Sequence, residues 1–420
     1  MSTNLALDKT VAREDTPVVH ERAIVWLLGL TVIIVIMNTS MFNLALPEVA
    51  TQFSLNPSVA SWVVTGYSIV FALSSITYSR LSDFVPIRTL MTIAGLSLGG
   101  ASIMGIFSDN FGVLLGARLI QATGAGAIMS LSYVFLSRYI PQSRRGRAMA
   151  MISSAASLGL GLGPVVGGAI VQYLGWHVLF VVTAVTLLLV PFLRRWMPNE
   201  SVLRGSFDAL GASFIGIGVS SLLLCLTDKN VWLLLGGILA IALFILRIRR
   251  TASPFVLPKL FGDRQYLLLA SIGIGTYMVS FTFLFISMLA LALCATHFDW
   301  AVLAFYILTS ISFTAATSAV SNEMSRQLSK VLLASGMGLF QMMQFFSGAL
   351  GVTLSGSALV WQRTLPANHA FDNILWGMVA LCILTIISSV VYCWLRERNV
   401  NLSQLPIDLY PQEDGNHEQI

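Results

Sequence analysis

Arg118 is the residue whose type and position most strongly indicate a function. It lies in the apolar run 112–137 and is the only charged residue well inside any apolar run of the sequence. A cation in hydrocarbon is costly, and such a residue usually marks a pathway for a substrate or an ion. Gln121 follows three residues later, so a helix places both side chains on one face. The pair predicts a polar site within a membrane.

Three further amide side chains are expected to belong to this site. Asn38 lies about eight residues below the outer end of its run and Arg118 about six, which places both ~9–12 Å deep at ~1.5 Å per residue. Gln341 and Gln344, also at i and i+3, fall near the middle of a later run. Hydrogen bonds between helices would explain the amides equally well. The predicted substrate or proton pathway comprises Asn38, Arg118, Gln121, Gln341 and Gln344.

Small residues recur at helical spacing in the run 148–174. Gly159, Gly163 and Gly167 stand four residues apart, with Pro164 between them. In water this pattern would break a helix, but in a membrane small residues on one face allow close helix packing and proline is tolerated. We therefore predict a closely packed membrane helix here.

The elements that position these residues are membrane helices. Hydrophobic residues make up 56% of the chain and charged residues 10%, and the mean hydropathy is +0.81. This composition predicts an all-α, polytopic membrane protein rather than a soluble domain. About twelve apolar runs approach the ~20 residues that a transmembrane helix needs. They lie at 24–46, 59–79, 89–107, 112–137, 148–174, 177–193, 209–227, 231–246, 266–296, 300–320, 331–361 and 373–395.

Basic residues predict the orientation of these helices. With the N-terminus inside, 21 of the 24 lysines and arginines fall on the inner side, as the positive-inside rule requires. Residues 1–22 and 397–420 are then cytoplasmic tails, and the first lacks the apolar core of a cleavable signal. The same distribution accounts for the net charge of +5, so the lipid bilayer rather than nucleic acid is the expected partner.

Motifs for enzyme chemistry are missing from the sequence. It contains no H-E-x-x-H, no G-x-x-x-x-G-K-[ST] and no G-x-S-x-G pattern. The four cysteines show no C-x-x-C spacing, so neither a metal site nor a cofactor is expected. The sequence predicts a protein that is not an enzyme, and any pumping by it draws on an ion gradient or an outside partner.

Four segments carry a family resemblance. They are N-T-S-M-F-N-L-A-L-P at 38–47, Y-S-R-L-S-D-F-V-P-I-R at 78–88, L-G-A-R-L-I-Q-A-T-G at 115–124, and the G-x-x-x-G-P-x-x-G-G pattern at 159–168. Together they resemble the major facilitator superfamily, in particular its fourteen-helix drug:proton antiporter branch, which includes tetracycline and multidrug efflux proteins.

The resemblance implies roles for individual residues. The arginine of the third segment, Arg118, is implicated in proton transfer in such proteins. Asp83 and Arg88 would help latch the two halves of the molecule in the outward-open state. The pattern of the fourth segment is characteristic of exporters, and it adds Gly159, Gly163, Pro164, Gly167 and Gly168 to the predicted gating residues.

The sequence also departs from that branch. Relatives carry an acidic residue at or next to Asn38, and tetracycline-type relatives carry a glutamate where this chain reads Ser347-Gly348-Ala349. One helical hairpin of the second half is missing. The expected parts are a six-helix bundle at 23–200, a linker with two extra helices at 201–264 and a shortened helix bundle at 265–396.

These observations predict a secondary active exporter in the plasma (inner) membrane. It would move small amphipathic or cationic organic compounds, such as drugs or tetracycline, by alternating access and proton antiport. Two alternatives remain: export of a self-made metabolite such as a siderophore, and a non-transporting membrane sensor or degenerate relative, which the missing hairpin and carboxylates favour.

Overall fold

The computed structural model describes residues 20–200, 207–228, 230–251, 254–294, 299–329, 332–362 and 367–403. Most of the two predicted tails, at 1–19 and 404–420, lies outside these residues, as does the linker segment 201–206. The last helix continues to Ser403 and so extends beyond the predicted end of its run at 395.

Helices form at every predicted apolar run. Two runs are interrupted, at Ser61 between α3 and α4 and at Val185 between α8 and α9. In the described part of the chain, eight helical segments are long and apolar enough to cross a membrane by length and composition. The elements are α2 (Glu21–Gln52), α3 (Pro57–Ala60), α4 (Trp62–Leu81), α5 (Ile87–Ile106), α6 (Phe111–Tyr139), α7 (Gln142–Leu174), α8 (Val178–Ala184), α9 (Thr186–Trp196), α10 (Ala209–Asp228), α11 (Val231–Arg250), α12 (Lys259–Gly262), α13 (Arg264–Cys294), α14 (Asp299–Gln327), α15 (Leu333–Trp361) and α16 (Ala367–Ser403).

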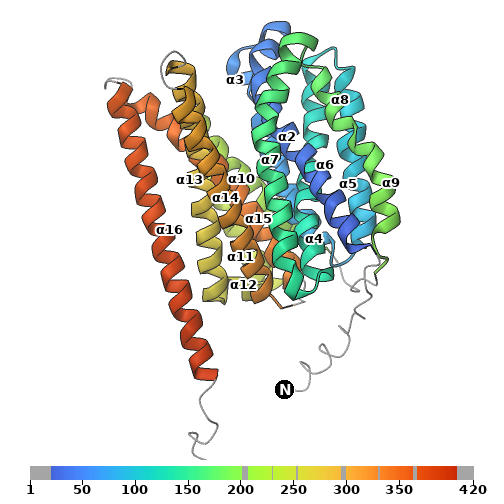
Figure 1. The fold of residues 1–420 in the computed structure, drawn as a ribbon, viewed down its shortest axis with the longest axis vertical. Coiled ribbons are helices and arrows are strands. Elements are labelled where there is room, and N and C mark those ends of the chain that lie inside the picture. The colour runs from blue at the N-terminus through green and yellow to red at the C-terminus, as the bar shows by residue number, and fades with distance from the viewer. Residues whose placement is uncertain are drawn as a thin grey trace, which may run out of the picture.

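The first group of helices, α2 to α9, forms a bundle around α6 (Figure 1). Small residues allow α6 to lie in its centre. A Cβ atom at Gly124 would stand only 2.7 Å from the backbone nitrogen of Leu98, and one at Gly126 would overlap the carbonyl of Phe71. Close packing of this kind stabilises helices in a membrane, where lipid tails are as apolar as leucine. It also buries the polar residues that α6 carries.

The second group, α13 to α16, packs around α13 and meets the first group mainly through two helix pairs, with a smaller contact between α15 and α6. α15 packs on α4, and α14 packs on α7. The long α16 lies at the outside of the molecule (Figure 1), and only 11% of its most apolar stretch, within Asn373–Arg396, is buried. Its exposed apolar side chains suit a face turned to lipid.

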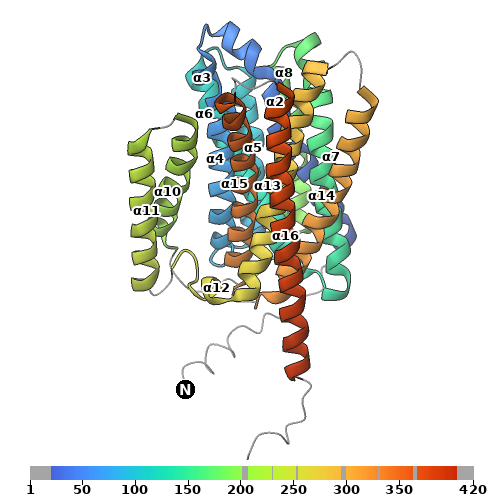
Figure 2. The same cartoon turned by 90° about the vertical axis from the view of Figure 1, so that its left-hand side faces the viewer.

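The α10–α11 hairpin stands beside the two groups (Figure 2). Asp208, which lies just before α10, holds the end of the hairpin at which α11 carries its basic residues. Asp208 accepts a hydrogen bond of 2.7 Å from Arg247 at the end of α11 and one of 3.3 Å from the backbone nitrogen of Phe255. The hairpin is therefore anchored at one end.

Candidate functional site

Arg118 is fully buried inside the first bundle, and three helices supply its hydrogen bonds. Its Nη1 donates to Asn38 Oδ1 of α2 at 3.1 Å and to Gln121 Oε1 of α6 at 2.9 Å. Its Nε donates to the carbonyl oxygen of Val63 in α4 at 3.4 Å. The structure therefore brings together three of the five residues that were predicted to form the pathway.

Two aromatic rings enclose the guanidinium group of Arg118. Its central carbon lies 3.9 Å from the ring centroid of Phe42 and 4.0 Å from that of Tyr67. The negative faces of aromatic rings attract a cation most strongly where water is excluded. This sandwich helps to stabilise the buried cation, and Phe42 is a partner of Arg118 that the sequence did not indicate.

A chain of polar side chains continues from this site in two directions. Gln121 Nε2 donates to Ser102 Oγ of α5 at 2.7 Å and to Thr183 Oγ1 of α8 at 3.3 Å. Asn38 Nδ2 donates to the hydroxyl of Tyr67 at 3.3 Å. Each amide thus bridges Arg118 to a further helix. Ser102 and Thr183 escaped the sequence prediction because hydroxyl residues are common in membrane helices and carry no charge signal.

One nitrogen of Arg118 remains free. Nη2 is buried and has no hydrogen-bond partner among the residues that the structure describes. Within those residues no carboxylate pairs with Arg118; the described ion pairs all lie near helix ends. An unsatisfied charged donor in low dielectric is costly. The site can therefore accept one more oxygen, whether from water, a neutral ligand or an anion.

An unbroken series of ring contacts links Arg118 to the second helix group. Tyr67 stacks on Phe71 with centroids 6.1 Å apart, and Phe71 meets Phe345 of α15 edge-on at 4.5 Å. Phe345 in turn contacts Tyr277 of α13 at 5.6 Å. We call these four rings the aromatic series. It gives the buried cation a packed route to the other half of the molecule.

Gln341 and Gln344 lie apart from Arg118, on α15. Both are buried, and within the described residues both polar atoms of Gln341 and Nε2 of Gln344 have no hydrogen-bond partner. Gln341 lies near the hydroxyl of Tyr133 in α6 without a hydrogen bond of normal geometry. Buried amides without hydrogen-bond partners are uncommon. These two would gain partners in a conformation that exposes them to water or to a ligand.

The glycines of α7 lie against α2 at the predicted close spacing. A Cβ atom at Gly159 would stand 2.7 Å from the carbonyl oxygen of Ile33, and one at Gly167 would stand 2.9 Å from Cα of Met41. Gly163 is equally confined by Ser40, whereas Gly168 has ordinary room beside Leu44. The helix continues through Pro164.

Asp83 forms a buried ion cluster at the end of α4. Its carboxylate contacts Arg80 Nη1 at 2.6 Å and Arg138 Nη2 at 2.8 Å. Arg138 also lies 3.6 Å from Glu200, which accepts from the hydroxyl of Tyr139. Arg88, predicted to act with Asp83, instead donates to Asn199 at 3.2 Å. Arg80, Arg138 and Glu200 are further members of this cluster. Arg80 lies one turn before Asp83, whereas Arg138 and Glu200 are distant in the sequence and could not be assigned without the fold.

Several bonds at this same end join the two helix groups. Ser79 Oγ donates to the carbonyl oxygen of Ala334 at 2.6 Å, and Arg145 Nη1 donates to Ser325 Oγ at 3.1 Å. Arg80 Nη2 reaches the carbonyl oxygen of Pro254 at 3.3 Å. Since they connect helix ends rather than cores, these bonds can break without unfolding either group.

This arrangement suits the movement of a solute rather than the making or breaking of covalent bonds. It offers a buried cation with one free donor, unpaired amides and two helix groups held at one end. Among the described residues no three histidine, cysteine, aspartate or glutamate side chains gather to hold a metal ion.

Known proteins similar to this chain are transporters. RibZ, a riboflavin transporter of Clostridioides difficile, is 28% identical over 57% of this chain and 54% of its own length. MdtD of Yersinia enterocolitica, whose name provisionally marks a multidrug resistance protein, is 24% identical over 58% and 54%. The chain thus spans about half the length of these relatives.

The fold is that of a solved sugar transporter. The proton:xylose symporter XylE superposes with a TM-score of 0.55 over 87% of this chain and 94% of its own, at 12% identity. The family model of the Major Facilitator Superfamily matches residues 28–290, which is more than half of the chain. Members of this family are membrane transporters and not enzymes. By the family model and by its fold, this chain belongs to the Major Facilitator Superfamily.

Proposed function

We propose that this protein exports small organic molecules across the plasma membrane by alternating access, driven by proton exchange. Arg118 is the observation that carries the proposal, because a fully buried cation without a carboxylate serves poorly as a structural element. Its free Nη2 provides a contact that a passing solute or a water can use.

The direction of transport rests on α7. The resemblance of its glycine pattern to that of exporters supports export, and its close packing on α2 gives the pattern a physical basis. The names of two relatives, a riboflavin transporter and a provisional multidrug resistance protein, support small organic substrates.

The conformational cycle follows from the bonds that join the two helix groups. If the N-terminus of α2 faces the cytoplasm, Ser79–Ala334 and Arg145–Ser325 close the cytoplasmic side. The closed contacts then represent the outward-facing state. Breaking them would open the path to the cytoplasm, while the aromatic series transmits the occupancy of the Arg118 site to α15.

The charge of the substrate follows from electrostatics. Arg118 meets no carboxylate in the described membrane helices, so a cationic solute close to it would be repelled in a low dielectric. Neutral and anionic compounds are therefore better substrates than the cationic drugs that the sequence resemblance favours. The same argument supports a second candidate function, which is the export of a self-made metabolite such as a siderophore, if that metabolite is anionic.

Inside-out vesicles test the proposal. We would add matched cationic, neutral and anionic aromatic compounds, and measure both proton release and uptake of the labelled compound. We expect uptake of the compound together with proton release. Arg118→Ala should abolish both, and Arg195→Ala, at an exposed helix end, should leave both intact. Uptake without proton movement would leave an exporter but remove proton coupling. Absence of both, for every compound, would contradict transport and favour the non-transporting alternative.

A further inference from the structure

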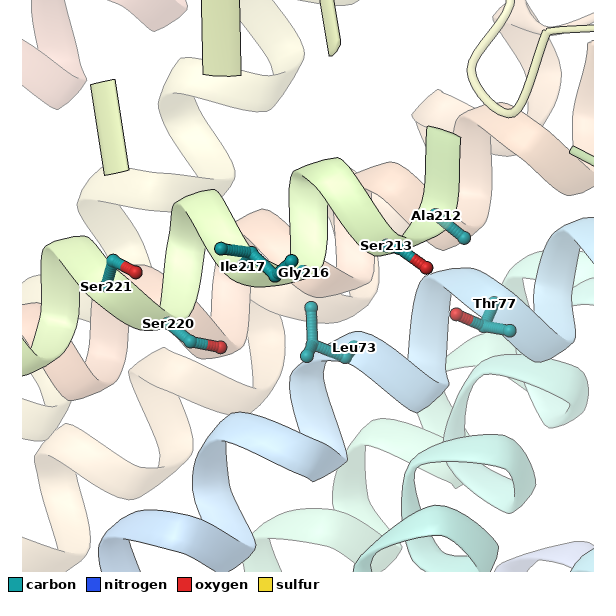
Figure 3. A pocket seen from close by; sticks show the side chains of 8 residues that line it. All are labelled: Leu73, Thr77, Ala212, Ser213, Gly216, Ile217, Ser220 and Ser221. Atoms are coloured by element: carbon teal, nitrogen blue, oxygen red, sulfur yellow. The ribbon is translucent and has the colours of Figure 1, made fainter. Parts of the chain in front are cut away.

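A crevice of about 590 Å³ lies between α4 and α10. Figure 3 shows Leu73 directed toward Gly216, while Ser213 and Thr77 face each other nearer the ends of their helices. This volume is within the roughly 300–1,000 Å³ of small-molecule sites. The lining is mostly apolar, and its residues are Leu73, Thr77, Ala212, Ser213, Gly216, Ile217, Ser220 and Ser221.

The crevice lies at the depth of one membrane leaflet. Thr77 stands four residues before the end of α4, or ~6 Å along the axis, and Ser220 stands eleven residues after the start of α10, or ~17 Å. The crevice therefore runs from the membrane surface to about the middle of the bilayer. It is open to the side, which would face lipid in a membrane.

Contacts at the surface end of the crevice hold the hairpin to the bundle. Asp208 binds Arg247 and the backbone of Phe255, and the neighbouring carbonyl of Pro254 accepts from Arg80 at the end of α4. These contacts thus join the two walls near the surface end of the crevice. The exposed lining beyond them is mostly apolar in area, although Thr77, Ser213, Ser220 and Ser221 contribute hydroxyl groups.

Unpaired positive charge lies at the same end. Arg249 and Arg250 end α11 directly after Arg247, and both are exposed. Within the described residues neither forms an ion pair, because Asp208, the nearby carboxylate, is already taken by Arg247. Basic residues at the cytoplasmic surface attract anionic lipid headgroups. The mostly apolar crevice suits the acyl chain of a lipid, and the two arginines at the same end of the hairpin suit an anionic headgroup.

We propose that the crevice binds one anionic phospholipid, with an acyl chain between α4 and α10 and its phosphate at Arg249 and Arg250. The lipid fills the crevice between these two helices, and so completes the attachment of the hairpin to the bundle. This site is separate from Arg118, and it does not depend on the substrate that the protein moves.

Titration of the purified full chain with phosphatidylglycerol or phosphatidylcholine of identical acyl chains tests this proposal. Native mass spectrometry would count the retained lipid. One phosphatidylglycerol should be retained at about tenfold lower concentration than phosphatidylcholine. Arg249→Gln with Arg250→Gln should weaken its retention about tenfold or more, as expected from loss of two headgroup charges. The matched pair Arg194→Gln with Arg195→Gln, exposed at the end of α9, should leave retention unchanged.

Filling the crevice tests the position of the acyl chain. A Cβ atom at Gly216 would make ordinary contact with Leu73 at 3.4 Å, so Gly216→Leu should extend into the crevice and displace either lipid. Gly236→Leu adds the same volume to open space on the hairpin and should have no effect. Ser220→Leu repeats the test if Gly216→Leu does not fold. The proposal would be overturned if the Arg249/Arg250 and Arg194/Arg195 double variants lost lipid equally. It would also be overturned if a folded variant with a filled crevice retained the lipid fully.

Discussion

Ser79 of α4 donates a hydrogen bond of 2.6 Å to the carbonyl oxygen of Ala334 in α15, although 255 positions separate the two residues. At this point the helices approach so closely that a Cβ atom at Gly338 would overlap the Ser79 side chain. This hydroxyl and this glycine, together with the Arg145–Ser325 bond, therefore help to hold the two helix groups together at one end.

Loss of this bond should shift the molecule toward its other conformation. Ser79→Ala removes the donor at a cost of about 1 kcal/mol, which changes a two-state ratio about fivefold. Spin labels at the exposed Gln142 and Ser329 should show a larger share of long distances by double electron–electron resonance. Ser213→Ala, whose hydroxyl bonds only within its own helix, is the control. An unchanged distance distribution would show that the bond does not govern the equilibrium.

The ring of Tyr67 should matter more for stability than its hydroxyl. Tyr67→Phe keeps the ring over Arg118 but removes the acceptor for Asn38 and Thr39, at a cost near the ~0.6 kcal/mol average for membrane helices. Tyr67→Leu also removes the cation–π contact and should cost about 2 kcal/mol more. Thermal unfolding in nanodiscs would compare them. Equal losses for the two variants would mean that the ring does not stabilise the cation.

Adjacent glycines of α7 should respond differently to alanine. Gly167→Ala forces a methyl group against Cα of Met41, a backbone atom, and should destabilise the protein by about 1–3 kcal/mol. Gly168→Ala meets only Leu44 Cδ1 at 3.6 Å, so it should stay within about 0.5 kcal/mol. The measurements are the melting temperature and transport of the labelled substrate. If both variants behave alike, helix contact does not explain the glycine pattern.

The buried ion cluster should be far more sensitive than an exposed pair. Asp83→Ala removes the carboxylate that pairs with Arg80 and one of those that pair with Arg138, which keeps Glu200 at 3.6 Å. The change should cost about 3–5 kcal/mol because both cations are largely buried. Glu21→Ala breaks a pair whose Arg144 side chain is 61% exposed, and should cost at most about 1 kcal/mol. Unfolding midpoints of the two variants provide the comparison, and similar midpoints would contradict the assigned burial effect.

The aromatic series should couple the two helix groups energetically. Phe71→Leu and Phe345→Leu, alone and combined, form a double-mutant cycle across the contact at 4.5 Å. We expect a coupling energy of about 0.5–1.5 kcal/mol in stability. Ile69→Ala with Phe345→Leu serves as the reference cycle. Strict additivity of the Phe71 and Phe345 effects would show that the rings touch without transmitting energy.

The helices could be predicted from the sequence because hydropathy and charge decide them without tertiary information. Depth counting along the helices also placed Asn38 and Arg118 at one level, and they are joined at 3.1 Å. Depth says nothing of direction around the axis, however. Gln341 and Gln344 lie on α15, and no hydrogen bond within the described residues joins either of them to Arg118.

Other members of the site were hidden for physical reasons. Phe42 is one of 24 phenylalanines, and nothing local distinguishes a ring that covers a cation from one that faces lipid. Arg138 and Glu200 look like ordinary loop charges until folding brings them to Asp83. Only packing between distant segments reveals such partners.

The order of the Arg118 partners along the chain has a consequence for biosynthesis. Asn38, Tyr67 and Ser102 all precede Arg118, so the ribosome delivers them to the translocon before the helix that carries the cation. Insertion of an arginine at the centre of an isolated helix costs ~2.5–3.5 kcal/mol. Earlier helices can relieve that cost as α6 enters the bilayer. Gln121 enters with Arg118 on the same helix, and Thr183 arrives later on α8. Arg118 can therefore find hydrogen-bond and aromatic partners in helices that are already in the membrane when α6 is inserted.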